Sequence, residues 1–390
     1  MQAQKIHLKR TKRLHAGHLW VFSNELFESP KNFAPGSLVE LYDMKEDFLG
    51  LGYINPNSLI AVRLLSRERR AIDRDFLKTR ISNALDLRKR LCSGLDSYRL
   101  VFSEADHLPG LIVDRYAGCL VIQILTFGME ALKDMIIGLL DEMLKPEVIV
   151  LRNEGRSRML EGLPLYKEIV KGSLDTLPVI QEEGVLFEID PYEGQKTGFF
   201  LDQRENRIAL REFVNGGRGL DLFCYSGAWS LHLAASGSEV TGVDDSERAV
   251  GQAVRNAGLN GLSDKAKFIK GDVFNFLGRE LEAGAGRYDF IVFDPPAFVK
   301  SSGRMKEAVR AYHELNTLCM KLLKPGGILA TSSCSYHLGR DMFLDMLRHS
   351  GREAGRSLRM LALRSQGRDH PILLSMPETE YLKCAFLMVD

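Results

Sequence analysis

The chain has 390 residues, of which 45% are hydrophobic, and its formal net charge at pH 7 is only +1. This length predicts about two or three domains, each with enough apolar material for a core. The near-neutral charge excludes a general basic field as the basis of nucleic-acid binding, so any such contact must come from local patches. Six scattered cysteines without a C-x-x-C pair argue against zinc and against a disulfide framework, and we expect no metal. We find no charged-then-apolar leader and no run of about 18 apolar residues, which predicts a cytoplasmic protein without membrane contact.

Residues 1–70 predict a small β-rich domain. Apolar runs at 37–42, 48–54 and 59–65 alternate with turn signals. Basic residues cluster at the two ends of this stretch, with Trp20 and Phe22 between them. Charge combined with aromatic rings suits contact with an RNA backbone and stacking on its bases, although a solvated rim around a barrel explains the same pattern equally well. The basic residues are Lys5, Lys9, Arg10, Lys12, Arg13, Arg63, Arg67, Arg69 and Arg70.

Residues 71–183 predict a linker helix followed by a compact α+β module. The helix covers 71–95, where apolar residues recur among Arg and Lys. Strands are expected at 98–102, 110–113, 120–125 and 148–151, with a helix over 129–144. Three arginines follow the last of these strands and form either an RNA-facing patch or an ordinary charged loop: Arg152, Arg156 and Arg158.

Residues 184–390 alternate strand and helix patterns, which predicts a doubly wound α/β domain with a mostly parallel sheet. We expect five strands at 219–223, 239–243, 266–269, 290–293 and 328–332. Two further strand-like stretches, 358–363 and 381–389, have no helical pattern between them. They predict a closing hairpin, in which the last strand runs antiparallel to its neighbours.

The first strand of this domain leads into a nucleotide-binding corner. It breaks into a small-residue turn that ends at Gly227, and a helix then begins at Ala228. Such a turn lets a ligand lie against the backbone at the helix N-terminus. The second strand ends in Asp244, which is suited to a ribose diol. A nicotinamide cofactor and S-adenosylmethionine (SAM) both fit, but a single glycine in the turn and Asp221 at its head favour SAM, which has no pyrophosphate to cradle.

Three carboxylates fall at strand ends. We expect Asp244 to hold the ribose, Asp272 the adenine amino group and Asp294 the reacting centre. A helix N-cap is the alternative role for any one of them. Two prolines after Asp294 stiffen the chain, and Phe298 adds a flat ring, so that residues 294–298 resemble the Asp/Asn-Pro-Pro-aromatic motif of nucleic-acid methyltransferases. We expect Pro295, Pro296 and Phe298 to contact the substrate base.

Cys334 follows the next strand. Neighbouring strands lie about 5 Å apart, so Cys334 and Asp294 can share a pocket. Methylation at carbon 5 of cytosine requires a thiolate that adds to carbon 6 and an acid at nitrogen 3, whereas methylation at nitrogen requires no such cysteine. A small buried residue is the alternative role for Cys334, and we expect the other five cysteines to be core or packing residues.

Several of these segments together resemble the bacterial 23S rRNA 5-methylcytosine methyltransferases that carry an N-terminal PUA domain. The resemblance rests on residues 194–207, 221–227, 294–298, 333–335, 370–371 and 381–383, and on 17–23 and 108–116 in the first half of the chain. It implies a Rossmann-like class I methyltransferase domain with a seven-stranded sheet, SAM as methyl donor, 23S rRNA or a large-subunit precursor as partner, and Cys334 as nucleophile. It also implies that a loop over 199–204 closes on the cofactor. The cofactor-binding residues are then Phe199, Asp202, Gln203, Arg204, Asp221, Phe223, Tyr225, Gly227, Asp244, Asp272 and Asp294.

One departure from a broader family and one set of shared elements keep alternatives open. Broader cytosine-5 enzymes place a second cysteine where this chain has Ala297. A related guanine-methylating family shares the elements at 195–200 and 294–296, so Cys334 alone separates the two substrates. A guanine N-methyltransferase, an RNA-binding assembly factor with a vestigial SAM site and, more distantly, a nicotinamide oxidoreductase are the other readings. A homodimer is compatible with the sequence, which does not fix the oligomeric state.

Overall fold

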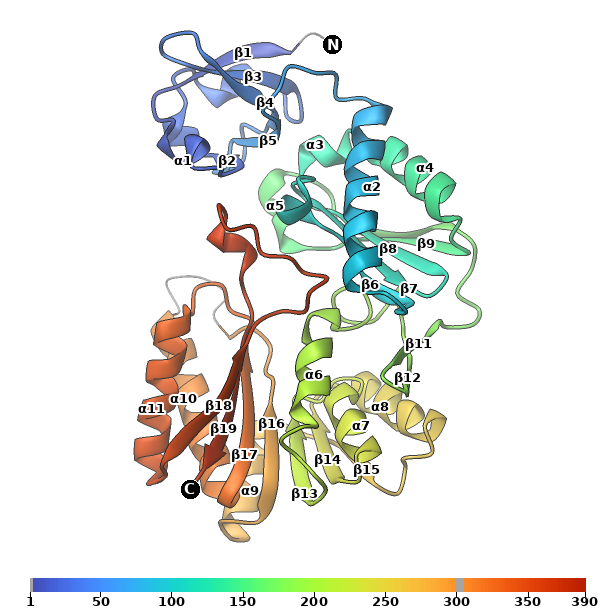
Figure 1. Ribbon diagram of the computed structural model, residues 1–390, viewed down its shortest axis with the longest axis vertical. Helices are drawn as coiled ribbons and strands as arrows, with labels where there is room; N and C mark the ends of the chain where they lie inside the picture. The colour runs from blue at the N-terminus through green and yellow to red at the C-terminus, as the bar shows by residue number, and fades with distance from the viewer. Residues whose placement is uncertain (1–2, 299–304) are drawn as a thin grey trace. The chain divides into compact units, whose positions relative to one another are not determined.

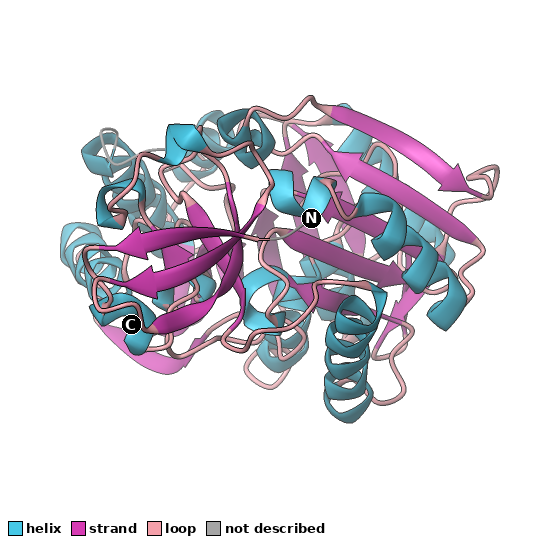
Figure 2. Ribbon diagram, turned by 90° about the horizontal axis from the view of Figure 1, so that it is seen from above, coloured by secondary structure: helices cyan, strands magenta, loops and turns pink. Residues whose placement is uncertain are grey.

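The computed structural model describes residues 3–298 and 305–390 (Figures 1 and 2). The chain forms two compact units. The N-terminal unit comprises Met1–Ile180, Ile189–Leu201 and Arg368–Thr379, and the C-terminal unit comprises Gln181–Glu188, Asp202–Gly367 and Glu380–Asp390. Among the described residues, no helix is both long enough and apolar enough to cross a membrane.

The first part of the N-terminal unit is a five-stranded sheet, which confirms the β-rich prediction. Its strand order is β1-β3-β4-β5-β2, with β1 parallel to β3 and the other pairs antiparallel. Ile6, Leu41 and Val62 point into its core and have no exposed surface. The elements are β1 (Gln4–Leu8), α1 (Lys12–His15), β2 (Trp20–Val21), β3 (Leu38–Asp43), β4 (Phe48–Ile54) and β5 (Val62–Ser66).

The second part of the N-terminal unit is a five-stranded sheet with helices, in the order β10-β9-β8-β7-β6. The predicted linker helix is α2 (Arg74–Leu91), which begins where the Asp73 carboxylate accepts a hydrogen bond from the backbone N–H of Phe76. The strands are β6 (Ser97–Phe102), β7 (Leu111–Tyr116), β8 (Cys119–Ile124), β9 (Val148–Asn153) and β10 (Tyr166–Lys171), and the other helices are α3 (Phe127–Glu130), α4 (Lys133–Leu144) and α5 (Arg156–Glu161).

A polar seam joins these two sheets inside the N-terminal unit. The Tyr53 hydroxyl donates to the carbonyl oxygen of Pro109 at 2.7 Å, and the indole N–H of Trp20 donates to Glu104 at 2.9 Å. Arg63 pairs with the buried carboxylate of Glu161 at 2.8 Å. The sequence pattern grouped Arg63 with the basic cluster at the end of the β-rich domain. The side chain is only 8% exposed, and its charge is paired with Glu161 inside the unit.

The C-terminal unit contains one seven-stranded sheet in the order β15-β14-β13-β16-β17-β19-β18. The first five strands are parallel, and β19 is antiparallel to both β17 and β18, as the sequence predicted. The strands are twisted relative to one another in Figure 2. Their bounds are β13 (Arg218–Leu222), β14 (Glu239–Asp244), β15 (Ala266–Lys270), β16 (Tyr288–Phe293), β17 (Leu323–Ser333), β18 (Leu358–Arg364) and β19 (Lys383–Val389).

Helices cover this sheet, and α10 and α11 pack side by side (Figure 1). The central strands are apolar because both faces are covered: Leu220, Leu222, Ile291 and Phe293 have no exposed surface. The helices are α6 (Arg204–Leu210), α7 (Ala228–Ala235), α8 (Glu247–Leu259), α9 (Val273–Glu282), α10 (Met305–Leu322) and α11 (Arg340–Ala354), and a short hairpin of β11 (Val179–Glu182) and β12 (Val185–Glu188) precedes them.

Candidate active site

The turn between β13 and α7 is tightly wound at the carboxyl edge of the sheet. Phe223, Tyr225 and Gly227 all have left-handed backbone angles, with φ of 63°, 47° and 82°. Residues other than glycine rarely adopt this conformation, and it persists only where the surroundings impose it. Here the Asp244 carboxylate accepts a hydrogen bond from the backbone N–H of Tyr225 at 2.9 Å. The predicted corner is therefore a constrained turn held by the end of β14.

Asp221 anchors the same turn from β13. One carboxylate oxygen, Oδ2, accepts hydrogen bonds from the backbone N–H of Ser230 at 3.0 Å and from its hydroxyl at 2.7 Å. The other, Oδ1, is buried and has no hydrogen-bond partner in the described part of the chain. Burial raises the pKa of this carboxyl group to about 7, and the charges of Asp294 and Asp244 raise it further against the hydrogen bonds from Ser230. An acceptor left open beside a cluster of carboxylates fits a positively charged ligand such as the amino or sulfonium group of SAM.

The carboxylates of Asp244 and Asp272, at the end of β14 and just after β15, differ in burial and in their contacts. Asp244 is only 7% exposed, and burial raises its pKa. Its Oδ1 accepts from the backbone N–H of Ser246 at 3.0 Å, so it supports the backbone at two points. Asp272 is exposed and caps α9, because its side chain accepts from the backbone N–H of Asn275 at 2.9 Å. The N-cap alternative therefore holds for Asp272, and its contact with adenine stays a prediction.

Asp294 follows β16 and is held by two side chains. Gln203 Nε2 donates to Oδ1 at 2.9 Å, and the indole N–H of Trp229 donates to Oδ2 at 3.0 Å. Gln203 also donates to the hydroxyl of Ser332 at 3.1 Å and accepts from Asn206 at 2.7 Å. The predicted cofactor-loop residue Gln203 and the predicted acid Asp294 are thus in direct contact. Trp229 was not predicted, although a buried indole N–H regularly has a polar partner and lies here just after the turn.

The remaining loop residues are divided between the units. Asp202 is buried, and its carboxylate accepts from the hydroxyl of Tyr381 at 2.6 Å. Arg204 is 1% exposed at the start of α6. Phe199 belongs to the N-terminal unit, where its carbonyl oxygen accepts from the hydroxyl of Tyr116 at 3.4 Å. Closure of the loop on a cofactor therefore stays a prediction.

The residues after Asp294 are partly packed inside the unit. Pro295 is buried and Pro296 is exposed. The ring of Phe298 lies 4.7 Å from the ring of Tyr312 and 6.1 Å from that of Phe223, measured between ring centroids. Phe298 is partly buried against the core in this structure, and its contact with a substrate base stays a prediction.

Cys334 follows β17 directly and differs from the other five cysteines, which are all buried, because it is partly exposed. Burial raises the pKa of the thiols of Cys119 and Cys384 to about 12, so both stay protonated at neutral pH. The strands β16 and β17 pair with Phe293 opposite Thr331, so Asp294 and Cys334 follow neighbouring strands at the same edge. Cysteine chemistry at this edge is therefore possible at Cys334 and suppressed at the buried thiols.

The arginines after β9 require a correction. Arg152 is 8% exposed and donates to the carbonyl oxygens of Pro191 and Gly194 at 3.0 and 2.9 Å. Arg158 has no exposed surface and pairs with Glu130 at 2.7 Å. Both side chains are used inside the N-terminal unit, so neither is available for a phosphate as the patch interpretation required. Arg156 is exposed and keeps that prediction.

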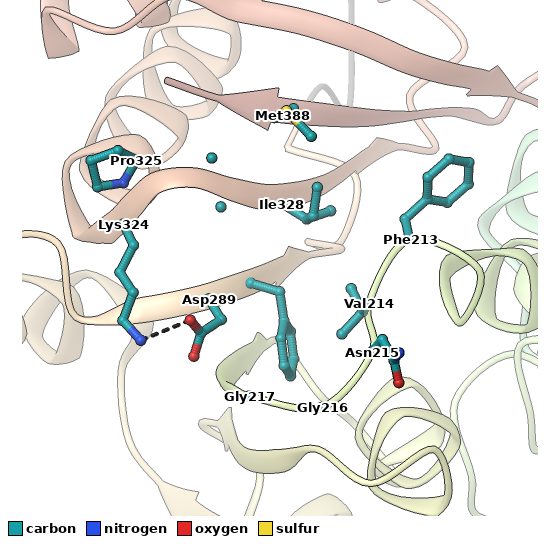
Figure 3. A pocket seen from close by; sticks show the side chains of 13 residues that line it. Phe213, Val214, Asn215, Gly216, Gly217, Asp289, Lys324, Pro325, Ile328 and Met388 are labelled. Atoms are coloured by element: carbon teal, nitrogen blue, oxygen red, sulfur yellow. Dashed lines mark hydrogen bonds and ion pairs between the residues drawn. The ribbon is translucent and has the colours of Figure 1, made fainter.

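A pocket of about 330 Å³ lies at the other edge of the C-terminal sheet (Figure 3). Gly217, Asp289 and Lys324 line it where β13, β16 and β17 begin, and Lys324 pairs with Asp289 at 2.7 Å. The carboxylates and Cys334 lie where these strands end. In open α/β sheets ligands bind at the carboxyl ends of the strands, so this pocket is separate from the candidate site.

The strand order, the constrained turn and the acids at the carboxyl edge define an open α/β domain that binds an adenosine-containing cofactor. Comparison with known proteins identifies the family. A PUA-like domain matches residues 5–67, and the S-adenosylmethionine-dependent methyltransferase family matches residues 167–369. The chain is 38% identical over 380 residues to ribosomal RNA large subunit methyltransferase I of Shewanella amazonensis, and 38% identical over 381 residues to the Aeromonas hydrophila protein of the same name; each match covers 96% of both chains.

Solved structures share the fold. A Streptococcus mutans protein assigned to the SAM-dependent methyltransferases has a TM-score of 0.85 at 20% identity, covering 99% of this chain and 100% of its own. A methyltransferase in complex with SAH has a TM-score of 0.86 at 21% identity and covers both chains completely. The chain therefore belongs to the S-adenosylmethionine-dependent methyltransferases that carry an N-terminal PUA-like domain, and its cofactor is SAM.

Proposed function

We propose that this methyltransferase modifies carbon 5 of a cytosine in 23S rRNA, with Cys334 as the nucleophile. The observation that carries the proposal is the partial exposure of Cys334, which follows the strand next to the one that precedes Asp294, while the other five thiols are buried. The relatives of 38% identity, named as methyltransferases of large-subunit ribosomal RNA, support the choice of substrate. Action on ribosomal RNA agrees with a cytoplasmic protein, and a homodimer stays a prediction.

The proposed reaction needs a thiol and an acid because carbon 5 of cytosine is a poor nucleophile. The Cys334 thiolate forms a bond to carbon 6, and the displaced ring electrons develop charge at nitrogen 3, where a protonated Asp294 donates a hydrogen bond. Bound SAM supplies an electrophilic methyl group. Carbon 5 forms a bond to the methyl carbon while the bond from that carbon to the sulfonium sulfur breaks, which leaves S-adenosylhomocysteine, and carbon 5 then loses its proton to a base. The electron pair of the C–H bond returns to the ring and expels Cys334 as the thiolate.

The contacts around the acid support its role. Gln203 and Trp229 each donate a hydrogen bond to one oxygen of Asp294, so the orientation of the carboxyl group is fixed before a base arrives. The target atom is stacked inside RNA, and the base must be flipped out to reach this edge. For the cofactor we propose that Asp221 faces its positive charge, that Asp244 accepts from the ribose and that Asp272 reaches the adenine.

For the RNA we propose contacts on the PUA-like domain and at Arg156. Three exposed cations lie over aromatic rings on the first sheet and its connections: Arg13 over Phe22 at 4.5 Å, Lys5 over Tyr42 at 4.5 Å and Arg69 over Phe48 at 4.3 Å. The pairs Arg13–Phe22 and Arg69–Phe48 combine a phosphate-binding charge with a partly exposed ring. Tyr42 is only 5% exposed and Lys5 also pairs with Glu46, so the third pair offers a charge without a ring for stacking. We propose domain boundaries of 1–70 for the PUA-like domain, 71–183 for the central module and 184–390 for the methyltransferase domain.

The test is methylation of unmodified 23S rRNA with methyl-labelled SAM, followed by digestion to nucleosides. We expect the label in 5-methylcytidine with the wild type and with Cys384→Ala, a matched control in which a buried thiol on β19 is removed. We expect no label there with Cys334→Ala. Label in a methylguanosine that survives Cys334→Ala would favour the guanine N-methyltransferase, and RNA binding without any label would favour the assembly factor.

A further inference from the structure

Lys383 is a buried cation next to Cys334. It is the first residue of β19 and pairs with Ser333, the last residue of β17, which directly precedes Cys334. Its side chain is largely buried, and the residue is 6% exposed. The ammonium group donates to the carbonyl oxygen of Ser335 at 2.7 Å and to that of Tyr381 at 2.9 Å. The positive charge is thus held at the backbone of the residues on either side of Cys334, since Lys383 pairs with Ser333 and donates to Ser335.

The hydrogen bonds of this ammonium group found among residues 3–298 and 305–390 go to carbonyl oxygens, and Glu380 acts on it through its charge. A buried charge without a countercharge beside it is costly even when it is hydrogen-bonded, and the usual response is a shift of its pKa. Burial lowers the pKa of Lys383 to about 8, and the charge of Cys334 is the largest influence that opposes this shift. The negative charge that best compensates Lys383 is therefore a thiolate at Cys334.

We propose that Lys383 is a positioning residue that stabilises the thiolate of Cys334 and so prepares the nucleophile. The inference rests on the proposed role of Cys334 in catalysis. By reciprocity, the thiolate stabilises the ammonium group by the same free energy with which the ammonium group stabilises the thiolate. No proton has to move from Lys383 for the sulfur to attack; the ammonium supplies charge and the β17–β19 register holds it in place.

The other titratable groups around this pair do not replace Lys383. Tyr312, on α10, accepts a hydrogen bond from the hydroxyl of Ser333 at 3.3 Å, and burial raises its pKa, so it is neutral at neutral pH. Glu380 precedes β19 and carries a charge of the wrong sign to stabilise a thiolate, as does Asp294 when ionised. Lys383 is the cation that the described strands bring to this position.

The test measures the ionisation of the Cys334 thiol and does not depend on methyl transfer. Alkylation of Cys334 by iodoacetamide is measured from pH 6 to pH 10 by mass spectrometry of its peptide, and the five buried cysteines serve as internal references. We expect the wild-type rate to rise with a midpoint below the ordinary thiol value of about 8.5. We expect Lys383→Met to raise that midpoint and to slow alkylation at pH 7 about tenfold, which corresponds to one pH unit. Lys383→Arg keeps the charge and should stay within about threefold of the wild type.

An unchanged alkylation profile in folded Lys383→Met, or a wild-type midpoint at or above about 8.5, would overturn the inference. A purely structural role for Lys383 would lower the unfolding temperature of Lys383→Met without moving the profile. If Lys383→Met does not fold, the inference is still tested by the alkylation midpoint of the wild type and by the alkylation rate of Lys383→Arg. If Lys383→Met shifts the alkylation profile but the enzyme methylates guanine, the coupling of Lys383 to Cys334 is upheld and the proposed function is rejected. If cytosine methylation depends on Cys334 but the alkylation profile is unshifted, only the role of Lys383 is rejected.

Discussion

At the scale of single residues, Asp221 combines a structural role with a buried oxygen that has no hydrogen-bond partner in the described part of the chain. Its folded pKa of about 7 lies above the ordinary value of an aspartate, so folding is favoured by the protonated form. Stability from this group is therefore fully present below the ordinary pKa and is lost as the pH rises toward 7. Asp221→Asn keeps the acceptor for Ser230 and removes the charge.

We expect cofactor-free Asp221→Asn to unfold with a free energy about 2 kcal/mol higher than the wild type at pH 8, and with little difference at pH 4. Its SAM affinity should fall about tenfold or more, because the open acceptor has become a donor. Chemical denaturation at several pH values and calorimetric titration with SAM are the measurements. A variant that is destabilised equally at all pH values would contradict this description of Asp221.

Trp229 offers a second test at this scale. Trp229→Phe keeps the ring and removes the N–H that donates to Asp294 at 3.0 Å. We expect about 1 kcal/mol of lost stability and a fall in kcat of at least tenfold with little change in the KM for SAM, because the acid loses one of the two donors that orient it. Steady-state kinetics at saturating RNA separate the two constants. A change confined to the KM for SAM would assign Trp229 to cofactor binding instead.

The residues at the carboxyl edge of the sheet were easier to predict from the sequence than the side chains that hydrogen-bond to them. Asp244, Asp294 and Cys334 were recognisable because each directly follows an apolar strand. The hydrogen bonds of Asp294 were not predictable, since Trp229 and Gln203 approach it from separate segments that only the folded sheet brings together. For Asp272 a strand-end position does not distinguish a ligand-binding carboxylate from a helix cap.

At the scale of elements, the turn between β13 and α7 is the part of the sheet edge where we propose that the cofactor lies. Gly227 has φ of 82°, and a Cβ atom there would meet the ring of Phe268 at 2.8 Å. Gly237 also has a positive φ, of 100°, but a Cβ atom there would meet nothing within 4 Å. Gly237→Ala is therefore a control for Gly227→Ala, because it introduces the same kind of backbone strain without an overlap between the new Cβ atom and a neighbouring side chain.

We expect Gly227→Ala to be at least about 1 kcal/mol less stable than Gly237→Ala and to lose SAM binding, whereas Gly237→Ala should keep it. Thermal unfolding with and without SAM measures both effects. Equal behaviour of the two variants would mean that the approach of Gly227 to Phe268 has no bearing on the site.

The strands of the C-terminal unit were predictable for a physical reason. The apolar runs of the inner strands β13, β16 and β17 are largely buried, so hydrophobicity alone marks them, whereas the edge strands β15 and β18 are partly exposed. The strand β10 was missed because Tyr166–Lys171 is largely polar and lies at the edge of its sheet, where only one neighbour specifies the pairing. The helix α5 was read as a loop because six residues are too few to show a helical period.

At the scale of the whole molecule, charge is distributed between buried pairs and exposed residues that we propose contact RNA. Arg156 and Arg158 are two residues apart, yet only Arg156 is exposed. We expect Arg156→Ala to weaken RNA binding and to reduce the slope of log affinity against log salt by about 0.7, with little loss of stability. Arg158→Ala should instead cost about 3 kcal/mol or more, because the partly buried Glu130 and nearby carbonyl oxygens lose their donor.

Filter binding at several salt concentrations and thermal unfolding measure the two quantities. Equal effects of the two variants on RNA affinity would contradict the division into structural and binding arginines. Composition could not have made this division, since neighbouring arginines in one segment have the same chemistry and differ only in what the folded chain places around them.

The most direct measurement of the central claim is trapping of the covalent intermediate. In RNA that carries 5-fluorocytidine, carbon 5 has no proton to lose after methyl transfer, so the bond between Cys334 and carbon 6 cannot break by the normal route. We expect a denaturation-resistant protein–RNA complex that forms only with SAM and in which the RNA is attached to the Cys334 peptide. The complex should form with Cys384→Ala and be absent with Cys334→Ala. Methylation of the substrate without any such complex, or a complex that persists in Cys334→Ala, would contradict the central claim.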